Sequence, residues 1–465
     1  MSKPSITARS GHRMRALTGI CLGALILCAP AFYNGAPLVY SDTSTYLSSG
    51  FALETPFDRP IGYGLLLRLT SLNGISLWFS VLAQGLLISY LLWVLMGWLL
   101  RSASISRHLS LNLLLAVGTS LAWTTSLLMP DLFTPTMVLC FIVLITAPLG
   151  KADRIALYIL YAIACITHLS HPLFGILLVT VAGIVRILLP ERVRPDLSGR
   201  ALLIILVLSA SSWLTMGSAL SKSRPIFFMG AMAEHGVLSR YLEEHCPSEL
   251  RLCSFRGVLP MPGYAFVWDQ AGPVQQLGGF SSCRDEFQAI IRNTLSEPRY
   301  WLLHLNASVR ATFQQLTRYA IGDGLGPFGS GTELAERMAA HVPLSHPTHL
   351  TARQQRNDLS ALDAMKSVHH VVVVLSLVLV AILFWSVASF RMVITTCTLL
   401  LAVLLNAWIC GTFSGAIDRL GAKMSWLLPL LALTLVIQRF GRSRCSSTVP
   451  TRDPQAPFLG NNMPL

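Results

Sequence analysis

The fold is decided near the N-terminus by residues 16–46, which read ALTGICLGALILCAPAFYNGAPLVYSDTSTY. An apolar run fills most of this stretch, and a polar cluster around Asp42 follows it directly. About 20 consecutive apolar residues are enough to cross the hydrocarbon core of a membrane as a helix. The stretch therefore predicts a membrane span whose polar cluster lies at the membrane edge.

Similar apolar runs recur along the chain. Together with the first, they lie near residues 16–36, 76–99, 109–129, 132–149, 155–170, 172–189, 201–218, 368–388, 392–411 and 424–438. We therefore expect an all-α polytopic membrane protein with about ten transmembrane helices. The composition agrees, because 53% of the 465 residues are hydrophobic and only 12% are charged. A soluble chain carries roughly 25% charged residues, so a large soluble enzyme, a disordered chain and a disulfide scaffold are excluded.

The basic residues predict the orientation of these spans. With a cytoplasmic N-terminus, seventeen of the 35 Lys and Arg residues fall on cytoplasmic pieces. Fourteen lie in one long segment, residues 219–367, which translocates regardless of its charge. The short outer loops hold only Arg59, Arg68, Arg419 and Lys423. This bias predicts a multi-pass protein of the inner (cytoplasmic) membrane with both termini in the cytoplasm. The net charge of +13 then reflects topology, and no nucleic-acid partner is expected.

The same pattern divides the chain into parts. We expect a cytoplasmic basic tail (1–15), a transmembrane module of about seven spans (16–218) with a first outer loop (37–75), a mostly helical extracytoplasmic domain (219–367), a module of about three spans (368–438) and a cytoplasmic tail (439–465). The first span also resembles a cleavable signal peptide, but its apolar run continues to Val39, which favours a retained anchor. Cys246, Cys253 and Cys283 in the outer domain permit one disulfide whose pairing the sequence leaves open.

Acidic residues are scarce on the short outer loops, where charge near the hydrocarbon is costly and tends to be functional. Asp42 follows the first span, and Asp131 lies between the third and fourth spans, so their turns can face each other. The alternative is that each carboxylate caps a helix, one from Thr43 to Gly50 and the other span four. The others on these loops are Glu54, Asp58 and Asp418.

Basic and imidazole side chains near these carboxylates are candidates for anion binding. Arg59 can grip a phosphate through its guanidinium fork, or extend toward lipid headgroups as a snorkelling residue. His168 and His171 lie three residues apart at the outer end of span five, where they could bind phosphate, an acceptor or metal, or simply pack at the interface. Asp42 and Asp131 could hold a divalent cation, although two carboxylates without a third ligand leave the metal optional.

Around these residues the sequence resembles the GT-C superfamily of polyprenyl-phosphate-sugar-dependent glycosyltransferases, which includes protein O-mannosyltransferases and aminoarabinose transferases. Asp42 lies in the first outer loop, residues 58–63 (DRPIGY) lead toward the second span, and Asp131 follows Pro130. The likeness covers roughly residues 15–190. Two features depart from the family pattern. Ser41 precedes Asp42, so the adjacent Asp-Glu pair of the mannosyltransferases is absent, and residues 219–367 match no family domain.

The resemblance implies a GT-C-like fold and transfer of a hexosyl or pentosyl group from a polyprenyl-phosphate carrier to an envelope glycan, lipid or protein on the outer face. It makes membrane lipid, the lipid-linked sugar donor and the envelope acceptor the expected partners. Asp42 and Asp131 become candidate catalytic residues, and the candidate substrate-binding residues are Arg59, Tyr46, Tyr63, His168 and His171. The alternative function is a transporter or flippase of a lipid-linked envelope precursor, which predicts charges in mid-span and paired broken helices.

Overall fold

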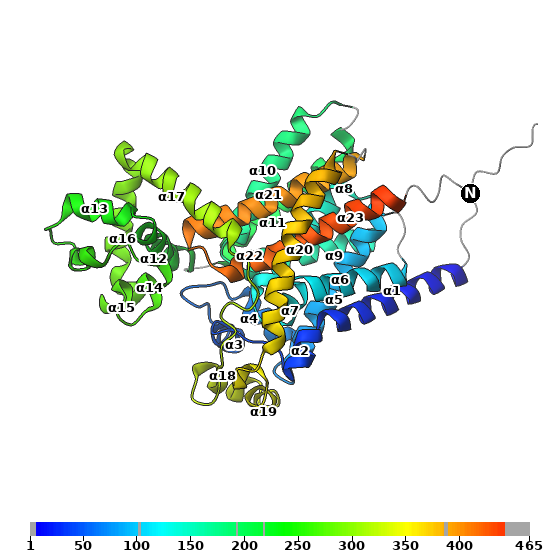
Figure 1. Cartoon of the computed structure of the whole chain (residues 1–465), viewed down its shortest axis with the longest axis horizontal. Coiled ribbons are helices and arrows are strands. Elements are labelled where there is room, and N and C mark those ends of the chain that lie inside the picture. The colour runs from blue at the N-terminus through cyan, green and yellow to red at the C-terminus, as the bar shows by residue number, and fades with distance from the viewer. Residues whose placement is uncertain (1–5, 101–103, 192–193, 217–218, 386–388, 442–465) are drawn as a thin grey trace, which may run out of the picture.

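The computed structural model describes residues 6–100, 104–191, 194–216, 219–385 and 389–441. Within these residues the chain consists of helices and loops, with one isolated bridge between Leu38 and Leu127 and no strand. The predicted all-α class is therefore confirmed (Figure 1). Residues 1–5 of the predicted basic tail and residues 442–465 of the predicted C-terminal tail lie outside the described residues.

Five helical stretches are long and apolar enough to cross a membrane, judged by length and composition among the described residues. A chain with several such helices has the character of a membrane protein. The stretches are α5 (Leu77–Leu99), α10 (His171–Leu188), α20 (Ser360–Phe384), α21 (Phe390–Phe413) and the consecutive helices α22 (Asp418–Ser425) and α23 (Leu427–Gly441), which qualify together over Asp418–Phe440.

The other predicted runs are also helical, but their apolar helical stretches are shorter than a full span. Three of them are apolar over 10–17 residues: Met14–Leu27, Pro130–Thr146 and Gly199–Thr215. A break at Cys28 separates two helices in the first run, and Thr119 with Ser120 separates two in the third. The helices concerned are α1 (Ile6–Leu27), α2 (Ala29–Asn34), α6 (Ile105–Gly118), α7 (Leu121–Ser126), α8 (Phe133–Thr146), α9 (Lys151–Thr167) and α11 (Gly199–Thr215). Five spans are thus supported by length, and ten remains a prediction.

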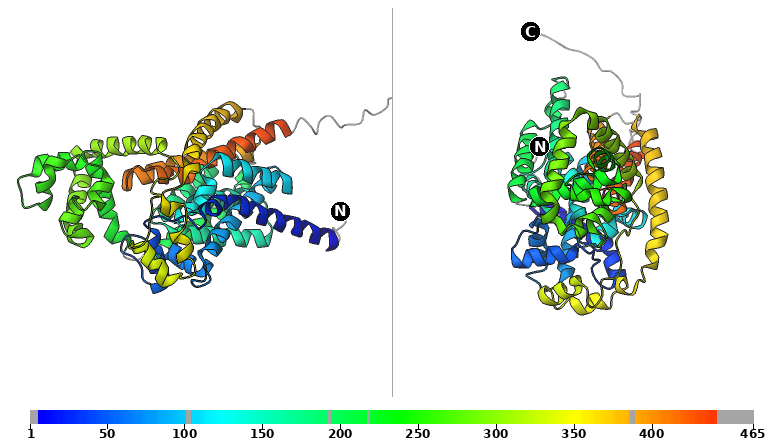
Figure 2. Two further views of the ribbon diagram at one scale, coloured as in Figure 1. Left: turned by 60° about the horizontal axis from the view of Figure 1, so that its bottom comes forward. Right: turned by 90° about the vertical axis from the view of Figure 1, so that its left-hand side faces the viewer.

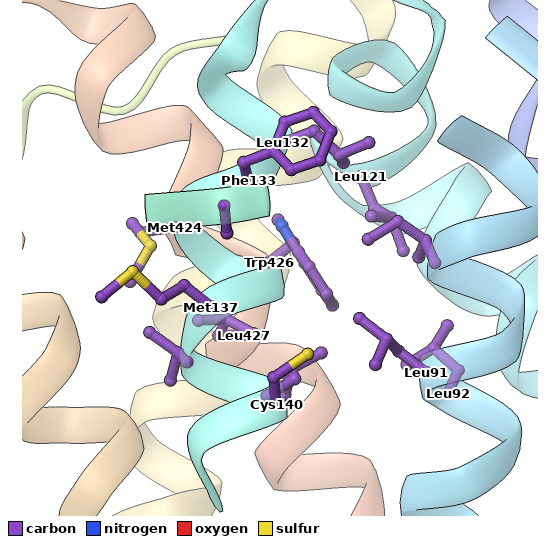
Figure 3. Packing of buried hydrophobic residues seen from close by; sticks show 14 of the residues in the cluster. Leu91, Leu92, Leu121, Leu132, Phe133, Met137, Cys140, Met424, Trp426 and Leu427 are labelled. Carbon is purple, nitrogen blue, oxygen red and sulfur yellow. The ribbon is translucent and has the colours of Figure 1, made fainter. Parts of the chain in front are cut away.

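Helix α8 lies at the centre of the main hydrophobic core. Every residue from Phe133 to Ile145 is buried, and the sequence from Met137 to Ile145 is apolar on all faces, as a fully surrounded helix requires. Trp426 is also fully buried, and Figure 3 shows its indole among side chains of α5, α8 and the α22–α23 junction. Because Asp131 lies in the 3₁₀ turn η1 (Pro130–Leu132) that leads into α8, this core fixes the position of its carboxylate.

A second hydrophobic core lies within the predicted outer domain, where Phe266, Phe287 and Tyr300 are among its buried members. Cys246 and Cys253 form a disulfide there, while Cys283 is buried and free, which settles the pairing that the sequence left open. The helices that build this core lie together at one side of the molecule (Figure 1). They are α12 (Ala219–Glu234), α13 (Val237–His245), η3 (Arg251–Val258), α14 (Gly263–Trp268), α15 (Pro273–Gln276), α16 (Gly279–Ser296) and α17 (Pro298–Thr317).

Residues 318–359, which we term the return segment, pack against the first outer loop instead of joining the second core. The segment contains α18 (Glu333–His341), α19 (His346–Leu350) and η4 (Gln354–Arg356), and α18 contacts α3 (Thr43–Ala52). The fully buried Gln354 side chain accepts from Val39 N (3.1 Å) and donates to Val39 O (2.7 Å). Ser345 Oγ accepts from Leu77 N at 3.0 Å. The return segment therefore holds the backbone that leads into Asp42.

Candidate functional site

Two turns far apart in the sequence lie side by side at the site. Leu38 N donates to Ser126 O (3.0 Å) and Leu128 N donates to Leu38 O (2.9 Å), which forms the isolated bridge. The Thr43 hydroxyl adds a bond to Leu128 O at 3.1 Å. These bonds hold the start of α3 beside the approach to η1. The prediction that the turns of Asp42 and Asp131 face each other is confirmed, because both carboxylates contact one guanidinium.

That guanidinium belongs to Arg419, in the first turn of α22. Its Nη1 donates to Asp131 Oδ2 at 3.1 Å, and its Nη2 lies 3.7 Å from Asp42 Oδ2. Asp42 Oδ2 also lies 3.1 Å from Arg59 Nη1, and Lys423 Nζ lies 3.7 Å from Asp131 Oδ1. We term Asp42, Arg59, Asp131, Arg419 and Lys423 the ionic cluster. It draws on α3, the loop before α4 (Gly62–Thr70), η1 and α22.

Most of the ionic cluster is buried, and its members differ in access to solvent. The side chain of Asp131 is 4% exposed and that of Lys423 is 1% exposed, whereas the side chain of Asp42 is 27% exposed. Buried charges persist in proteins only when they are paired. Asp131 is therefore held as an inner carboxylate between two cations, and Asp42 is the carboxylate that a ligand could reach.

Neither carboxylate acts as a helix cap. Asp42 occupies the N-cap position of α3, but its side chain makes no capping hydrogen bond. Asp131 lies inside η1, where no side-chain cap is present either. Both carboxylates instead form ion pairs with basic side chains, so helix capping does not explain why an acidic residue lies at either position.

Aromatic rings support both arginines. The guanidinium carbon of Arg59 lies 5.2 Å from the centre of the Tyr46 ring, and that of Arg419 lies 4.2 Å from the centre of the Tyr40 ring. Gly324 of the return segment touches Tyr40: its φ is +73°, and a Cβ there would lie 1.8 Å from Tyr40 Cε2. Only glycine fits at this point, so the return segment approaches the ring closely.

Burial and charge set the protonation of two of these groups. Burial alone would lower the pKa of the Arg59 guanidinium, but Asp42, Tyr46 and Asp58 outweigh it and raise that pKa, so Arg59 stays charged. Burial raises the pKa of the Tyr46 phenol, which therefore stays neutral and cannot serve as an anionic base. Asp58 Oδ2 accepts from Arg59 Nε at 3.0 Å and fixes the guanidinium from its other edge.

Tyr63 and His171 are buried and use their polar atoms in hydrogen bonds within the protein. Tyr63 is fully buried, meets Tyr46 edge to face at 5.0 Å and donates its hydroxyl to Gln84 Oε1 at 2.8 Å. His171 is also fully buried; its Nδ1 donates to Ala164 O (2.6 Å), which leaves Nε2 to accept from the Thr134 hydroxyl (2.8 Å). Both imidazole nitrogens are thus occupied, which agrees with the packing alternative.

His168 differs from its neighbour because it remains partly exposed. Its Nδ1 bonds the Ser170 hydroxyl at 2.8 Å, and the charges of Lys423, Arg419 and Arg59 act on its ring. Of the two predicted histidines, only His168 therefore combines access with closeness to the ionic cluster.

Arg419, Lys423 and Tyr40 belong to the site but were not predicted from the sequence. A signal was present, since Arg419 and Lys423 are two of only four basic residues on the short outer loops. A small pocket lies beside them, and within the described residues Arg419 Nε and Lys423 Nζ are buried without a hydrogen-bond acceptor. The residues that line this pocket include Ser120, Thr124, Asp131, Gly322, Asp323, Arg419 and Lys423. Buried donors of this kind suit an anion.

The arrangement does not fit a divalent cation held by Asp42 and Asp131. The guanidinium of Arg419 contacts Oδ2 of both carboxylates, which is where a bridging metal ion would need to lie. Within the described part of the chain, no three His, Cys, Asp or Glu residues are grouped closely enough to hold a metal ion.

Fold and site together define an all-helical chain with several helices long and apolar enough to cross a membrane. Its ionic cluster is mostly buried, and Asp42 is the carboxylate that solvent reaches. Comparison with protein families, curated proteins and solved structures finds no match. The function is therefore argued from the site itself.

Proposed function

We propose that the chain is an integral membrane glycosyltransferase of GT-C type, which transfers a sugar from a polyprenyl-phosphate carrier to an envelope acceptor. The observation that carries the proposal is the convergence of Arg59, Arg419 and Lys423 on Asp42 and Asp131. Cations whose N–H groups lack an acceptor can bind a lipid phosphate. An accessible carboxylate beside them can take a proton from the acceptor.

The cations would act on the leaving group. As the bond from the anomeric carbon to the phosphate oxygen breaks, its electron pair passes to that oxygen, and negative charge grows there. Arg419 Nε and Lys423 Nζ are buried donors without a protein acceptor among the described residues. Donors fixed in place before the reaction stabilise developing charge without reorganisation. The pocket beside them is small, so only the charged end of a lipid would enter it.

Asp42 would accept the proton of the acceptor. The acceptor oxygen or nitrogen attacks the anomeric carbon and forms the new glycosidic bond, while its proton passes to the Asp42 carboxylate. In the structure this carboxylate is paired with Arg59 and Arg419. A phosphate bound to both guanidinium groups would compete for them and free the Asp42 carboxylate to contact the acceptor. Asp131, almost fully buried, would position Arg419 and Lys423.

The proposed location is the outer face of the inner membrane. The Cys246–Cys253 disulfide supports it, because disulfides persist in oxidising compartments outside the cytoplasm. The ionic cluster lies at the ends of helices, away from mid-span, which favours a surface reaction over the alternative of a transporter or flippase.

Binding of a lipid phosphate tests the proposal. The probe is undecaprenyl phosphate, and its Kd for the purified full chain in nanodiscs is measured by native mass spectrometry. Arg59→Gln removes a charged hydrogen-bond donor worth about 1.5–3 kcal/mol, so we expect the Kd to rise roughly 10- to 100-fold. Arg68→Gln is the matched control, since Arg68 lies nearby but bonds Asn73 and contacts Phe51. Equal Kd values for both variants and the unmodified chain would contradict the proposal.

A further inference from the structure

An exposed apolar stripe runs along α17 of the outer domain. Its members are Trp301, Leu302, Leu305, Val309 and Phe313, whose residues are 46–67% exposed. At about 100° per residue, these five positions fall within an arc of about 120° on the helix. Arg310 lies next to the apolar stripe on the polar edge of the same exposed side, and Arg299, at the same edge, pairs with Glu244 and Glu297. The side of α17 that is exposed among the described residues is therefore amphipathic.

The side of α17 next to the apolar stripe is fixed to a candidate membrane span. Ser308 Oγ accepts from Trp408 Nε1 (2.9 Å) and bonds the Thr412 hydroxyl (2.9 Å), both on α21. Gln315 Nε2 donates to Ile417 O at 2.9 Å. Gly411 approaches so closely that a Cβ there would lie 2.6 Å from Ala311 O. The stripe is thus held at a set position beside α21, which itself exposes apolar side chains such as Leu404.

The geometry points to the outer leaflet of the lipid bilayer as the partner of this stripe, with α17 lying in the interface and not crossing it. Two observations favour lipid over a second copy of the chain. The stripe adjoins α21, whose own exposed apolar side chains must face lipid if α21 is a span. An arginine beside an apolar arc, as Arg310 is here, is the arrangement with which interfacial helices meet acyl chains and phosphate headgroups together. Figures 1 and 2 show α17 at the edge of the outer helices that borders α21.

Contact between α17 and lipid would give the outer domain a second attachment to the membrane, beyond its two chain connections, whatever reaction the chain catalyses. Such an attachment would set the height of the domain above the bilayer and hold the return segment, which begins where α17 ends, over the ionic cluster.

Photo-crosslinking tests the inference. p-Benzoylphenylalanine replaces Leu305 or Phe313 in the full chain, which is reconstituted into vesicles of phosphatidylethanolamine and phosphatidylglycerol and irradiated. The control position is Tyr264, which is 63% exposed on α14, at the other edge of the outer helices (Figure 1). Intact-mass analysis counts phospholipid adducts.

We expect several-fold more phospholipid adduct at positions 305 and 313 than at position 264. Equal yields at all three positions would overturn the inference. Crosslinked dimers in place of lipid adducts would overturn it as well, and would show that a second copy covers the stripe. Absence of any adduct from a chain that elutes as a single folded species would also count against it.

Discussion

Asp42→Asn is expected to lower formation of the glycosylated envelope product by about 10²–10⁴-fold, the range over which general-base catalysis contributes. Asn keeps the size of the side chain but cannot take the acceptor proton at neutral pH. The measurement is mass spectrometry of envelope glycans from a strain lacking the gene and complemented with each variant, normalised to the amount of chain in the membrane.

Glu54→Gln is the matched control for this experiment. Glu54 is an exposed acidic residue of the same outer loop and takes no part in the ionic cluster. Its replacement should leave the product unchanged. Product formed at the wild-type rate by Asp42→Asn, in a strain where loss of the gene abolishes it, would refute the assignment of Asp42.

Arg419→Met is expected to lower the free energy of unfolding by about 3–5 kcal/mol, because it leaves the Asp131 carboxylate buried with only Lys423 at 3.7 Å. The measurement is denaturant unfolding in detergent micelles. The Asp131→Asn/Arg419→Met double variant should cost less than the sum of the single changes, because it removes both charges of the pair. Both side chains of this pair are largely buried, so solvent screening is weak.

Arg337→Gln provides the comparison for this stability series. Arg337 pairs with Glu333 on the surface of α18, where both side chains are about half exposed or more. Exposed pairs contribute about 0–1 kcal/mol, so this variant should unfold almost like the unmodified chain. If Arg419→Met and Arg337→Gln lower the free energy of unfolding equally, the ionic cluster contributes no more to stability than an exposed ion pair does.

Much of the fold was predictable because apolar runs mark helices directly. Each predicted run coincides with one or more helices, and the all-α class follows from that. The number of spans was less predictable. Residues such as Cys28 and the pair Thr119 and Ser120 end helices within apolar stretches, and composition alone does not show where a helix breaks. Helix length and composition together therefore support five spans, although the apolar pattern indicates ten.

Only the site residues from the N-terminal part of the chain were predictable from the sequence. Asp42, Arg59 and Asp131 stood out because charge is scarce beside the predicted spans. Arg419 and Lys423 were overlooked because they lie almost 300 residues beyond Asp131, and only packing of α22 against η1 and α8 brings them together. Tyr63 and His171 had suitable chemistry, but their depth in the core depends on neighbours that a local pattern does not reveal.

The most direct measurement of the proposed reaction concerns the lipid donor itself. Lipid extracts of the strain lacking the gene, and of the Asp42→Asn strain, should accumulate the same polyprenyl-phosphate-linked sugar. Purified wild-type chain, given that lipid and an envelope fraction, should convert it to free polyprenyl phosphate, whereas Asp42→Asn should not. A lipid-linked sugar that fails to accumulate, or that the wild-type chain leaves intact, would contradict the account.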